Sequence, residues 1–333
     1  MTLPIFLTLD AQQYFFTILR IIFICSILLH IASVVFLTKY TPSNQAAWRN
    51  YMLFIQSCLV VLDIHLEILM SPVPIFPAPA GYATGLLCKL GVPVQVEAGL
   101  GMLIIANIGT STILCVFHKH QTVIVSSSRF RLSERANRIA HIGLIITYSF
   151  PPACYSSVVQ SQKITDELLE LDPRNLTWIS QRGCYFYQKK EPFHYAFVIG
   201  MFMIMITATF FLSFMFFHMN HIIRINSGKG SIRNLTNIRK SVARLFIQLM
   251  TPILLLVIPA MIIFTGLAAD GLVSFEQCLT LLIVMMLHPI VHNLLLLSLT
   301  PTFRRKILSV QMWLYIKSVK LEQWPPSRRF LQR

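Results

Sequence analysis

The strongest constraint on the fold is a series of apolar blocks, each about 20 residues long or longer, separated by short polar or basic stretches. At 1.5 Å of rise per residue, a helix of about that length crosses a hydrocarbon core about 30 Å thick. Only 12% of the 333 residues are charged, against about 25% in soluble domains. The sequence therefore predicts an all-α integral membrane protein, a seven-transmembrane helix bundle.

The predicted spans cover about residues 14–38, 51–70, 91–117, 139–159, 193–223, 242–268 and 272–299. The fourth span is the weakest because it is short and contains Pro151 and Pro152. We expect residues 1–299 to form one bundle. Residues 300–333 are expected to form a cytoplasmic tail that begins with an interfacial amphipathic helix, with Phe303 and Ile307 on its apolar face.

Lys and Arg in the connecting segments predict the orientation. With the N-terminus extracellular and the C-terminus cytoplasmic, 21 of the 28 basic residues fall on the inner side and six on the outer side. Positive charge is enriched in cytoplasmic loops, so this direction is favoured. The net charge of +15 then reflects topology and contact with anionic lipid rather than nucleic-acid binding.

Two features of the outer loops follow from that orientation. Asn175 and Asn234 each begin an Asn-x-Thr sequon, but we expect only Asn175, in the second outer loop, to be a glycosylation site. Cys88 and Cys184 both face the oxidising side, so a disulfide between them is favoured over two free thiols. The proline-rich stretch 72–85 predicts an extended, stiff connector, with the lining of an entrance for a lipophilic ligand as the alternative.

Ionisable residues within spans are costly and therefore informative. Asp63 and Glu67 lie four residues apart on one helix face, and Glu97 comes from the next span. Arg20, in the first span, is the expected cationic partner. These four residues are predicted either to form an internal ion pair that fixes helix register or to line a ligand pocket, and a proton or sodium path is the third reading.

Other chemistry is not indicated. The chain has no nucleophile, phosphate-loop or zinc-protease motif, so we expect no enzymatic activity and no cofactor. His288 and His292 lie four apart, but Pro289 distorts that turn and no third ligand is near in sequence, so no metal site is predicted.

Basic residues near the inner ends of the spans are predicted to dock a cytoplasmic partner as well as lipid. The residues singled out are Lys119, Arg129, Arg131, Arg135, Arg233, Arg239 and Lys240.

Three segments point to a family. They are the loop at 74–82, the run Lys119-His120-Gln121, and the stretch from His288 to Arg304 that ends in Thr-Pro-Thr-Phe-Arg. With the predicted topology, they resemble the nematode serpentine chemoreceptors, class I most closely and class H next. The acidic-Arg-aromatic and Asn-Pro-x-x-Tyr motifs of rhodopsin-class receptors are absent.

The resemblance implies a G-protein-coupled receptor of the plasma membrane, placed in a sensory cilium. It would bind a small-molecule chemical ligand on its outer side and signal to a heterotrimeric G protein inside. A transporter or channel is the alternative, disfavoured because the membrane acids cluster in the outer half of the spans.

Overall fold

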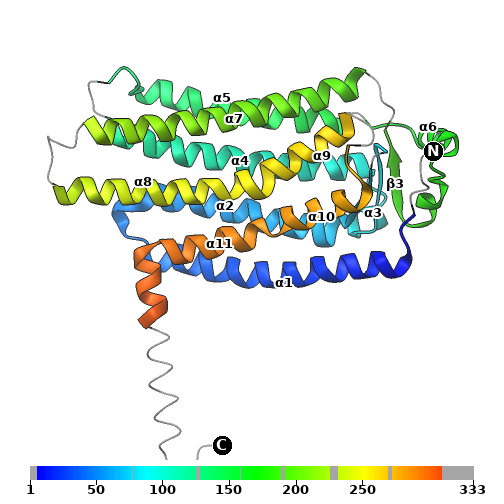
Figure 1. Cartoon of the computed structure of the whole chain (residues 1–333), viewed down its shortest axis with the longest axis horizontal. Coiled ribbons are helices and arrows are strands. Elements are labelled where there is room, and N and C mark those ends of the chain that lie inside the picture. The colour runs from blue at the N-terminus through cyan, green and yellow to red at the C-terminus, as the bar shows by residue number, and fades with distance from the viewer. Residues whose placement is uncertain are drawn as a thin grey trace, which may run out of the picture.

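The computed structural model describes residues 6–76, 78–124, 128–157, 159–188, 192–225, 232–268 and 272–309. Its long helices run side by side in one bundle (Figure 1). The start of α1 (Leu9–Tyr40) lies at the end that carries a small sheet, and residues 301–309 lie at the opposite end. We refer to these as the outer and inner ends, following the predicted orientation.

The other long helices cover the remaining spans. They are α2 (Ala46–Ile64) with the π-helix η2 (His65–Met70), α4 (Val94–Val123), α5 (Glu134–Ser157), α7 (Pro192–Ile225), α8 (Ile232–Pro252) continued by the π-helix η5 (Ile253–Val257) and α9 (Ile258–Ala268), and α10 (Phe275–Met286) followed by α11 (His288–Leu299). Shorter elements are η1 (Ser43–Gln45), α3 (Leu86–Lys89), α6 (Gln162–Leu171) and η3 (Thr177–Gln181).

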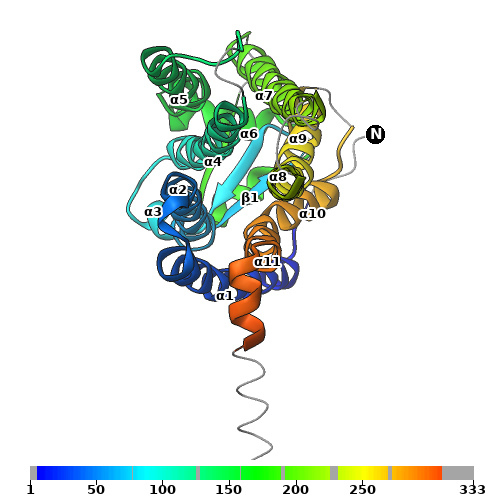
Figure 2. The same cartoon turned by 90° about the vertical axis from the view of Figure 1, so that its left-hand side faces the viewer.

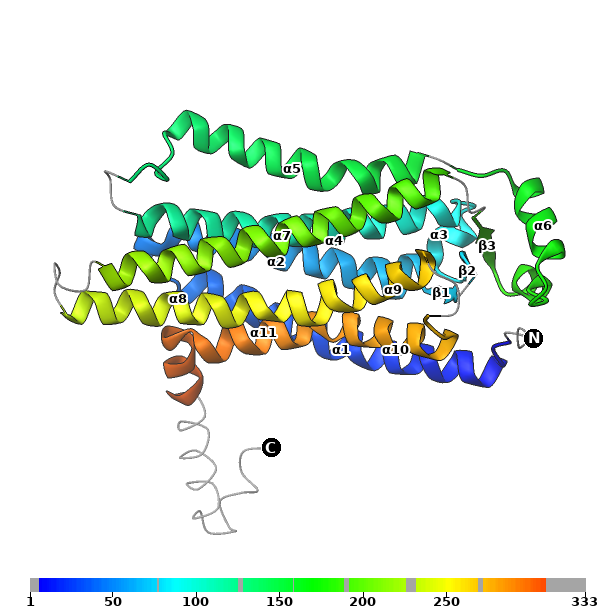
Figure 3. The ribbon, with the colours of Figure 1, turned by 45° about the horizontal axis from the view of Figure 1, so that its top comes forward.

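The fourth span is the least regular, as its sequence suggests. Within the described residues, six helices are long and apolar enough to cross a membrane, and α5 joined with α6 makes a seventh across an 83° bend. Figure 3 shows α5 along the bundle and α6 set apart at the outer end. Gly99 lets α4 and α5 approach closely, because a Cβ there would lie 2.4 Å from the Ser156 Cβ.

Local signals explain where helices start and bend. The Thr8 hydroxyl accepts from the Ala11 amide at the start of α1, and Ser274 forms a capping box with Gln277 at the start of α10. The π-helix η5 directly follows Pro252. A proline removes a backbone donor and disturbs the regular ladder of hydrogen bonds.

An antiparallel sheet at the outer end is the main feature that the sequence did not predict. It contains β1 (Pro72–Ile75), β2 (Ala80–Ala83) and β3 (Cys184–Tyr187), in that order. The proline-rich segment is extended, as expected, and the sheet pairing adds hydrogen-bonded neighbours that the prediction of a stiff connector did not include. Strands of four residues are too short to show a clear alternation of apolar and polar residues, and β3 comes from a distant loop. The sequence pattern therefore does not predict this pairing. Figure 2 looks along the bundle and shows β1 within the ring of helices.

The core and the lipid-facing surface separate as expected of a membrane bundle. Leu37, Leu59 and Leu296 are fully buried and join α1, α2 and α11 in one cluster. Large apolar side chains such as Ile24 and Phe210 are instead exposed on the outside of the bundle, where lipid is the natural solvent.

The segment after the seventh span is helical over 301–309. Phe303 is fully buried and packs against Phe36, with ring centroids 5.6 Å apart. Ile307 also packs on this core. Val310 and Leu314, which continue the same helical spacing in the sequence, lie outside the described residues.

Candidate functional site

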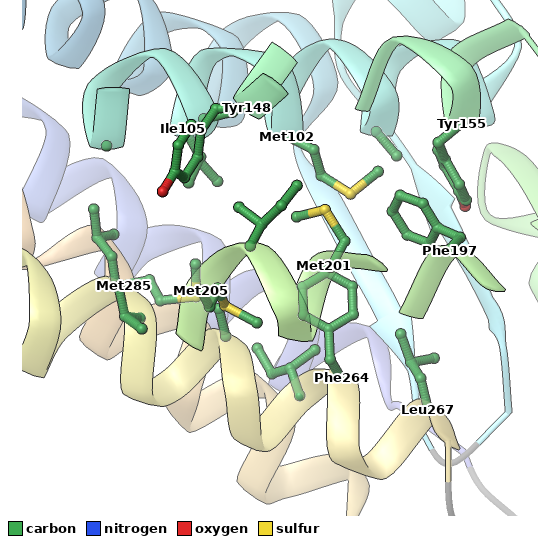
Figure 4. Close-up of a pocket in the computed structure, with 18 of the residues that line it drawn as sticks. Met102, Ile105, Tyr148, Tyr155, Phe197, Met201, Met205, Phe264, Leu267 and Met285 are labelled. Atoms are coloured by element: carbon green, nitrogen blue, oxygen red, sulfur yellow. The ribbon is translucent and has the colours of Figure 1, made fainter. Parts of the chain in front are cut away.

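A cavity of about 360 Å³ lies inside the outer part of the bundle, between α4, α5, α7, α9 and α10. In Figure 4, Met102 and Ile105 project from α4, Met201 and Met205 from α7, and Phe264 from α9. Ligand sites in proteins are typically concave and mostly apolar, with a few placed polar groups. This cavity is the leading candidate for a ligand site.

The cavity is lined both by the outer sheet and by the π-helix η5. The outer sheet lines one end of it through Pro74, Ala80 and Phe186. The π-helix η5 lines it through Ile253 and Leu256. A molecule bound there would therefore touch both the outer loops and the irregular turn of the sixth span.

A second, much smaller cavity of about 20 Å³ lies next to the first, and Thr112 and Pro252 line both. His288 and His292 also line it. Neither nitrogen of His288, nor Nε2 of His292, has a hydrogen-bond partner in the described part of the chain. A space of this size is large enough for one water.

The predicted membrane ionisable residues lie outside the large cavity. Arg20 Nε is 3.6 Å from Glu67 Oε1, and their side chains are 72% and 7% exposed. Arg20 therefore reaches one of the three predicted carboxylates. Its exposed guanidinium lies in the outer part of α1, where an arginine can extend toward lipid headgroups.

Asp63 belongs to a different, fully buried polar cluster between α1, α2 and α11. Its Oδ2 accepts from Ser26 Oγ at 2.5 Å and lies 3.2 Å from His30 Nε2. His30 Nδ1 lies 2.7 Å from Gln56 Oε1 and 3.1 Å from Asn293 Nδ2. All five side chains are buried. The cluster ties three helices together, and the partner of Asp63 is a histidine rather than Arg20.

Glu97 is buried in the first turn of α4, and neither carboxylate oxygen has a hydrogen-bond partner among the described residues. Its backbone oxygen lies 2.9 Å from His65 Nε2. Gly101 makes room for that ring, since an added Cβ would lie 3.3 Å from it. His65 opens the π-helix η2, and such irregular turns are frequent at functional sites.

The predicted partner-facing residues gather at the inner end of the bundle (Figure 1). Lys119 is half-buried near the end of α4. Exposed side chains follow on the segment after α4, on α5 and on α8: Arg129, Arg131, Arg135, Arg239 and Lys240. Arg233 belongs to α8, but its side chain lies outside the described residues.

Side chains next to Lys119 hold the second inner loop against α4. Gln121 Nε2 donates to the Phe130 carbonyl at 3.1 Å, and its Oε1 accepts from the Leu132 amide at 3.0 Å. His120 Nε2 lies 2.8 Å from His218 Nδ1, which links α4 to α7. The Lys-His-Gln run thus contributes two positioning residues that sequence reasoning had treated only as a family motif.

The outer loops are held by covalent and polar contacts. Cys88 and Cys184 form the predicted disulfide, which ties β3 to the end of α3. Asn175 is exposed on the second outer loop. In the same loop, Arg174 Nε donates to Asp172 Oδ1 at 2.8 Å and the Tyr187 hydroxyl donates to Asp172 Oδ2 at 2.7 Å.

Burial opposes the charged form of Asp172, but hydrogen bonds from Arg174 and Tyr187 outweigh it and hold the pKa of Asp172 below its ordinary value of 3.8. Burial, together with its hydrogen bond to Asp172, raises the pKa of Tyr187 to about 12. Both pKa shifts fit an ionised Asp172 that accepts hydrogen bonds from Arg174 and Tyr187.

Sequence reasoning missed most residues of the large cavity because none is Asp, Glu, Lys or Arg and, apart from those of the proline-rich loop at 74–82, none belongs to a motif. The available signal was weak: methionines recur at helical spacing, as at Met201 and Met205. In an apolar span, such a pattern is indistinguishable from ordinary packing.

Comparison with known proteins identifies the family. Residues 7–307 match the family model described as "Serpentine type 7TM GPCR chemoreceptor Sri". A search of curated proteins found no match. Among solved structures, the chain is similar to squid rhodopsin, with a TM-score of 0.58 and 10% identity, over 95% of this chain and 89% of that one. That likeness supports the fold. The chain is therefore a multi-pass membrane protein that belongs to the Sri family of serpentine seven-transmembrane chemoreceptors.

Proposed function

We propose that this chain is a chemosensory G-protein-coupled receptor. It binds an environmental small molecule in the large cavity from the extracellular side and activates a heterotrimeric G protein at its inner end. The observation that carries the proposal is the match to a chemoreceptor family over residues 7–307. The cavity beneath the outer sheet provides a place for the ligand. By the same resemblance, we assign the chain to class I rather than class H and place it in the plasma membrane of a sensory cilium.

The orientation in this proposal rests on charge. The N-terminus is extracellular because most Lys and Arg lie at the opposite end of the bundle. The exposed basic side chains Arg131, Arg239 and Lys240 then face the cytoplasm. They complement an acidic surface on a partner and also attract anionic lipid.

The mechanism follows from what lines the cavity. Ile253 and Leu256 belong to η5, and α8 continues from η5 to the inner end. A ligand that contacts η5 better in one bundle packing than in another shifts the equilibrium between the two packings. The inner end of α8 moves relative to α4 and α7, and the basic surface changes its fit to the G protein.

The decisive experiment uses the full chain in lipid nanodiscs with purified heterotrimeric G proteins. We expect nucleotide exchange above the rate with empty nanodiscs, increased by at least one member of a library of small environmental chemicals. The same chain in sealed vesicles is assayed for uptake and ion current. Transport of a library member without any nucleotide exchange would support the transporter alternative and overturn the proposal.

A further inference from the structure

The wall of the large cavity offers no carboxylate, ammonium or guanidinium group to a charged ligand. Among the described residues that line it, none is Asp, Glu, Lys or Arg. The polar side chains on its wall are Thr112, Tyr148, Tyr155, Gln188, His194 and Thr209. Thr112 and Thr209 already donate to the backbone of their own helices, to the carbonyls of Ile108 and Met205.

The charged groups of the membrane region are held elsewhere. Arg20 and Glu67 contact each other, and Asp63 contacts Ser26 and His30. None of these residues, nor Glu97, lines the cavity. An ion transferred from water into this site would lose hydration without gaining a counter-charge, which is strongly unfavourable.

The size of the cavity limits the ligand. Its volume is about 360 Å³, at the small end of the range of about 300–1,000 Å³ for ligand pockets. An apolar cavity of about 150 Å³ stays dry and holds benzene. The space therefore suits a molecule of about two fused six-membered rings.

The walls favour a polarisable ligand. Met102, Met201 and Phe264 line the cavity (Figure 4) and pack against the same cluster, which contains Tyr155 and Phe197. Thioether sulfur makes favourable contacts with aromatic rings, and flexible methionines adapt to the shape of the ligand. Phe197 adds another aromatic ring, whose centroid lies 6.1 Å from that of Phe264.

We infer that the cavity selects uncharged, largely apolar molecules with an aromatic or similarly polarisable ring system about the size of naphthalene. This inference rests on the proposed function, because it names the chemical class of ligand for the same site. Charged molecules of the same shape are excluded.

Binding of three shape-matched probes to the full chain in nanodiscs tests the inference without any G protein. The probes are 2-methoxynaphthalene, 2-naphthoate and 2-naphthylmethylammonium, and binding is measured as stabilisation against thermal unfolding and by probe fluorescence. We expect the neutral probe to bind at least about 100-fold more tightly than either ion. Equal or tighter binding of an ion overturns the inference.

Gly109 provides a variant that fills the cavity without harming the fold. It lines the cavity, and a Cβ added there meets no atom within 4 Å. Gly109→Leu also removes a glycine from a helix interior, which favours the helix. We expect this variant to keep its thermal stability and to bind 2-methoxynaphthalene about tenfold or more weakly, because leucine occupies the ligand volume.

Gly143→Leu is the matched control. Gly143 is also helical and also has open space at its Cβ, but it is exposed on α5 and does not line the cavity. It should bind the probe like the wild type. Binding to Gly109→Leu that is as tight as binding to Gly143→Leu and the wild type would attribute the signal to partitioning into lipid and would overturn the inference.

A volume-conserving variant tests the preference for polarisable rings. Met102→Leu with Met201→Leu keeps the cavity apolar and close to its size. We expect binding of 2-methoxynaphthalene to fall about threefold or more while binding of its saturated analogue, 2-methoxydecalin, is unchanged. Unchanged binding of both probes contradicts the aromatic preference.

The binding measurements and the nucleotide-exchange assay can fail separately. If the neutral probe binds more tightly than the two ions but no G protein exchanges nucleotide, the inference about the ligand holds and the proposed signalling function is refuted.

Discussion

His30 Nε2 lies 3.2 Å from Asp63 Oδ2, and both side chains are almost completely buried between α1 and α2. His30 also contacts Gln56 on α2 and Asn293 on α11. The pair therefore sits at the junction of three spans that are distant in sequence. A buried carboxylate is tolerated only when donors surround it.

Removing the histidine should destabilise the bundle. His30→Ala leaves Asp63 with Ser26 as its remaining hydrogen-bond partner among those the structure describes. Breaking a buried pair costs about 3–5 kcal/mol of unfolding free energy. The measurement is thermal unfolding in nanodiscs, with His221→Ala, an exposed histidine on α7, as the control. If the double variant His30→Ala, Asp63→Asn is no more stable than His30→Ala, the buried charge is not the cause.

Gln121 holds the second inner loop on α4, and its loss should free that loop. Gln121→Ala removes the acceptor of the Leu132 amide and the donor to the Phe130 carbonyl. We expect the Leu132 amide to exchange with solvent about tenfold faster, because a hydrogen bond contributes roughly 1 kcal/mol or more. Hydrogen exchange measured by mass spectrometry checks this.

The control for that experiment is Thr122→Ala. Thr122 is the next residue, and among the described residues its hydroxyl donates to the nearby Lys119 carbonyl alone. It should leave exchange at Leu132 unchanged. Identical protection in Gln121→Ala and wild type would mean that other contacts hold the loop.

Much of the fold could be predicted from the sequence because membrane spans obey a simple length rule. The disulfide followed from topology, since Cys88 and Cys184 were the loop cysteines on one side. The sheet could not be predicted, because Tyr82 pairs with Tyr185 across more than a hundred residues. Such pairing depends on how the spans arrange the loops in space.

The candidate site was harder to predict than the fold. Charged residues within the spans were the main sequence signal for a site, and these residues, Arg20, Asp63, Glu67 and Glu97, do not line the large cavity. A site for an apolar ligand is built from the same residue types as the core, so only the three-dimensional packing distinguishes a lined cavity from a filled one. Met102 is an example, because its position in the sequence of α4 does not distinguish a residue that lines a cavity from one that fills the core.

Glycosylation tests the orientation of the chain. Asn175 is exposed on the outer loop, and Asn234 belongs to α8 at the inner end. We expect Asn175→Gln to remove a mass shift seen on treatment with a glycosidase in cells, and Asn234→Gln to leave it unchanged. A glycan on Asn234 would reverse the assigned topology.

Asp172 should make the stability of the outer loop depend on acid pH. Its pKa is lowered in the folded chain because donated hydrogen bonds outweigh its burial. Its stabilisation is then fully present above the unfolded pKa of about 3.9 and is lost as pH falls through the lower folded value. Asp172→Asn should therefore destabilise by about 1.5–3 kcal/mol at pH 7 and by much less at pH 2.

The comparison uses thermal unfolding of wild type and variant at both pH values. Glu167→Gln, an exposed acid on α6, is the matched control and should have little effect at either pH. A difference between wild type and Asp172→Asn that stays constant down to pH 2 would show that the carboxylate charge is not responsible.

Charge at the inner end should govern coupling to the G protein. Arg239 and Lys240 are exposed on α8, so reversing both changes the surface potential without disturbing the core. Charged rim residues act mainly on the association rate. We expect Arg239→Glu with Lys240→Glu to lower nucleotide exchange about tenfold or more, while 2-methoxynaphthalene binds as before.

The matched control, Lys89→Glu with Lys163→Glu, changes the charge equally on exposed outer residues and should leave exchange unchanged. The glycan expected at Asn175 would report whether each variant keeps its orientation, because reversing inner charges can also alter topology. Full exchange in a correctly oriented inner variant would exclude this surface as the docking face.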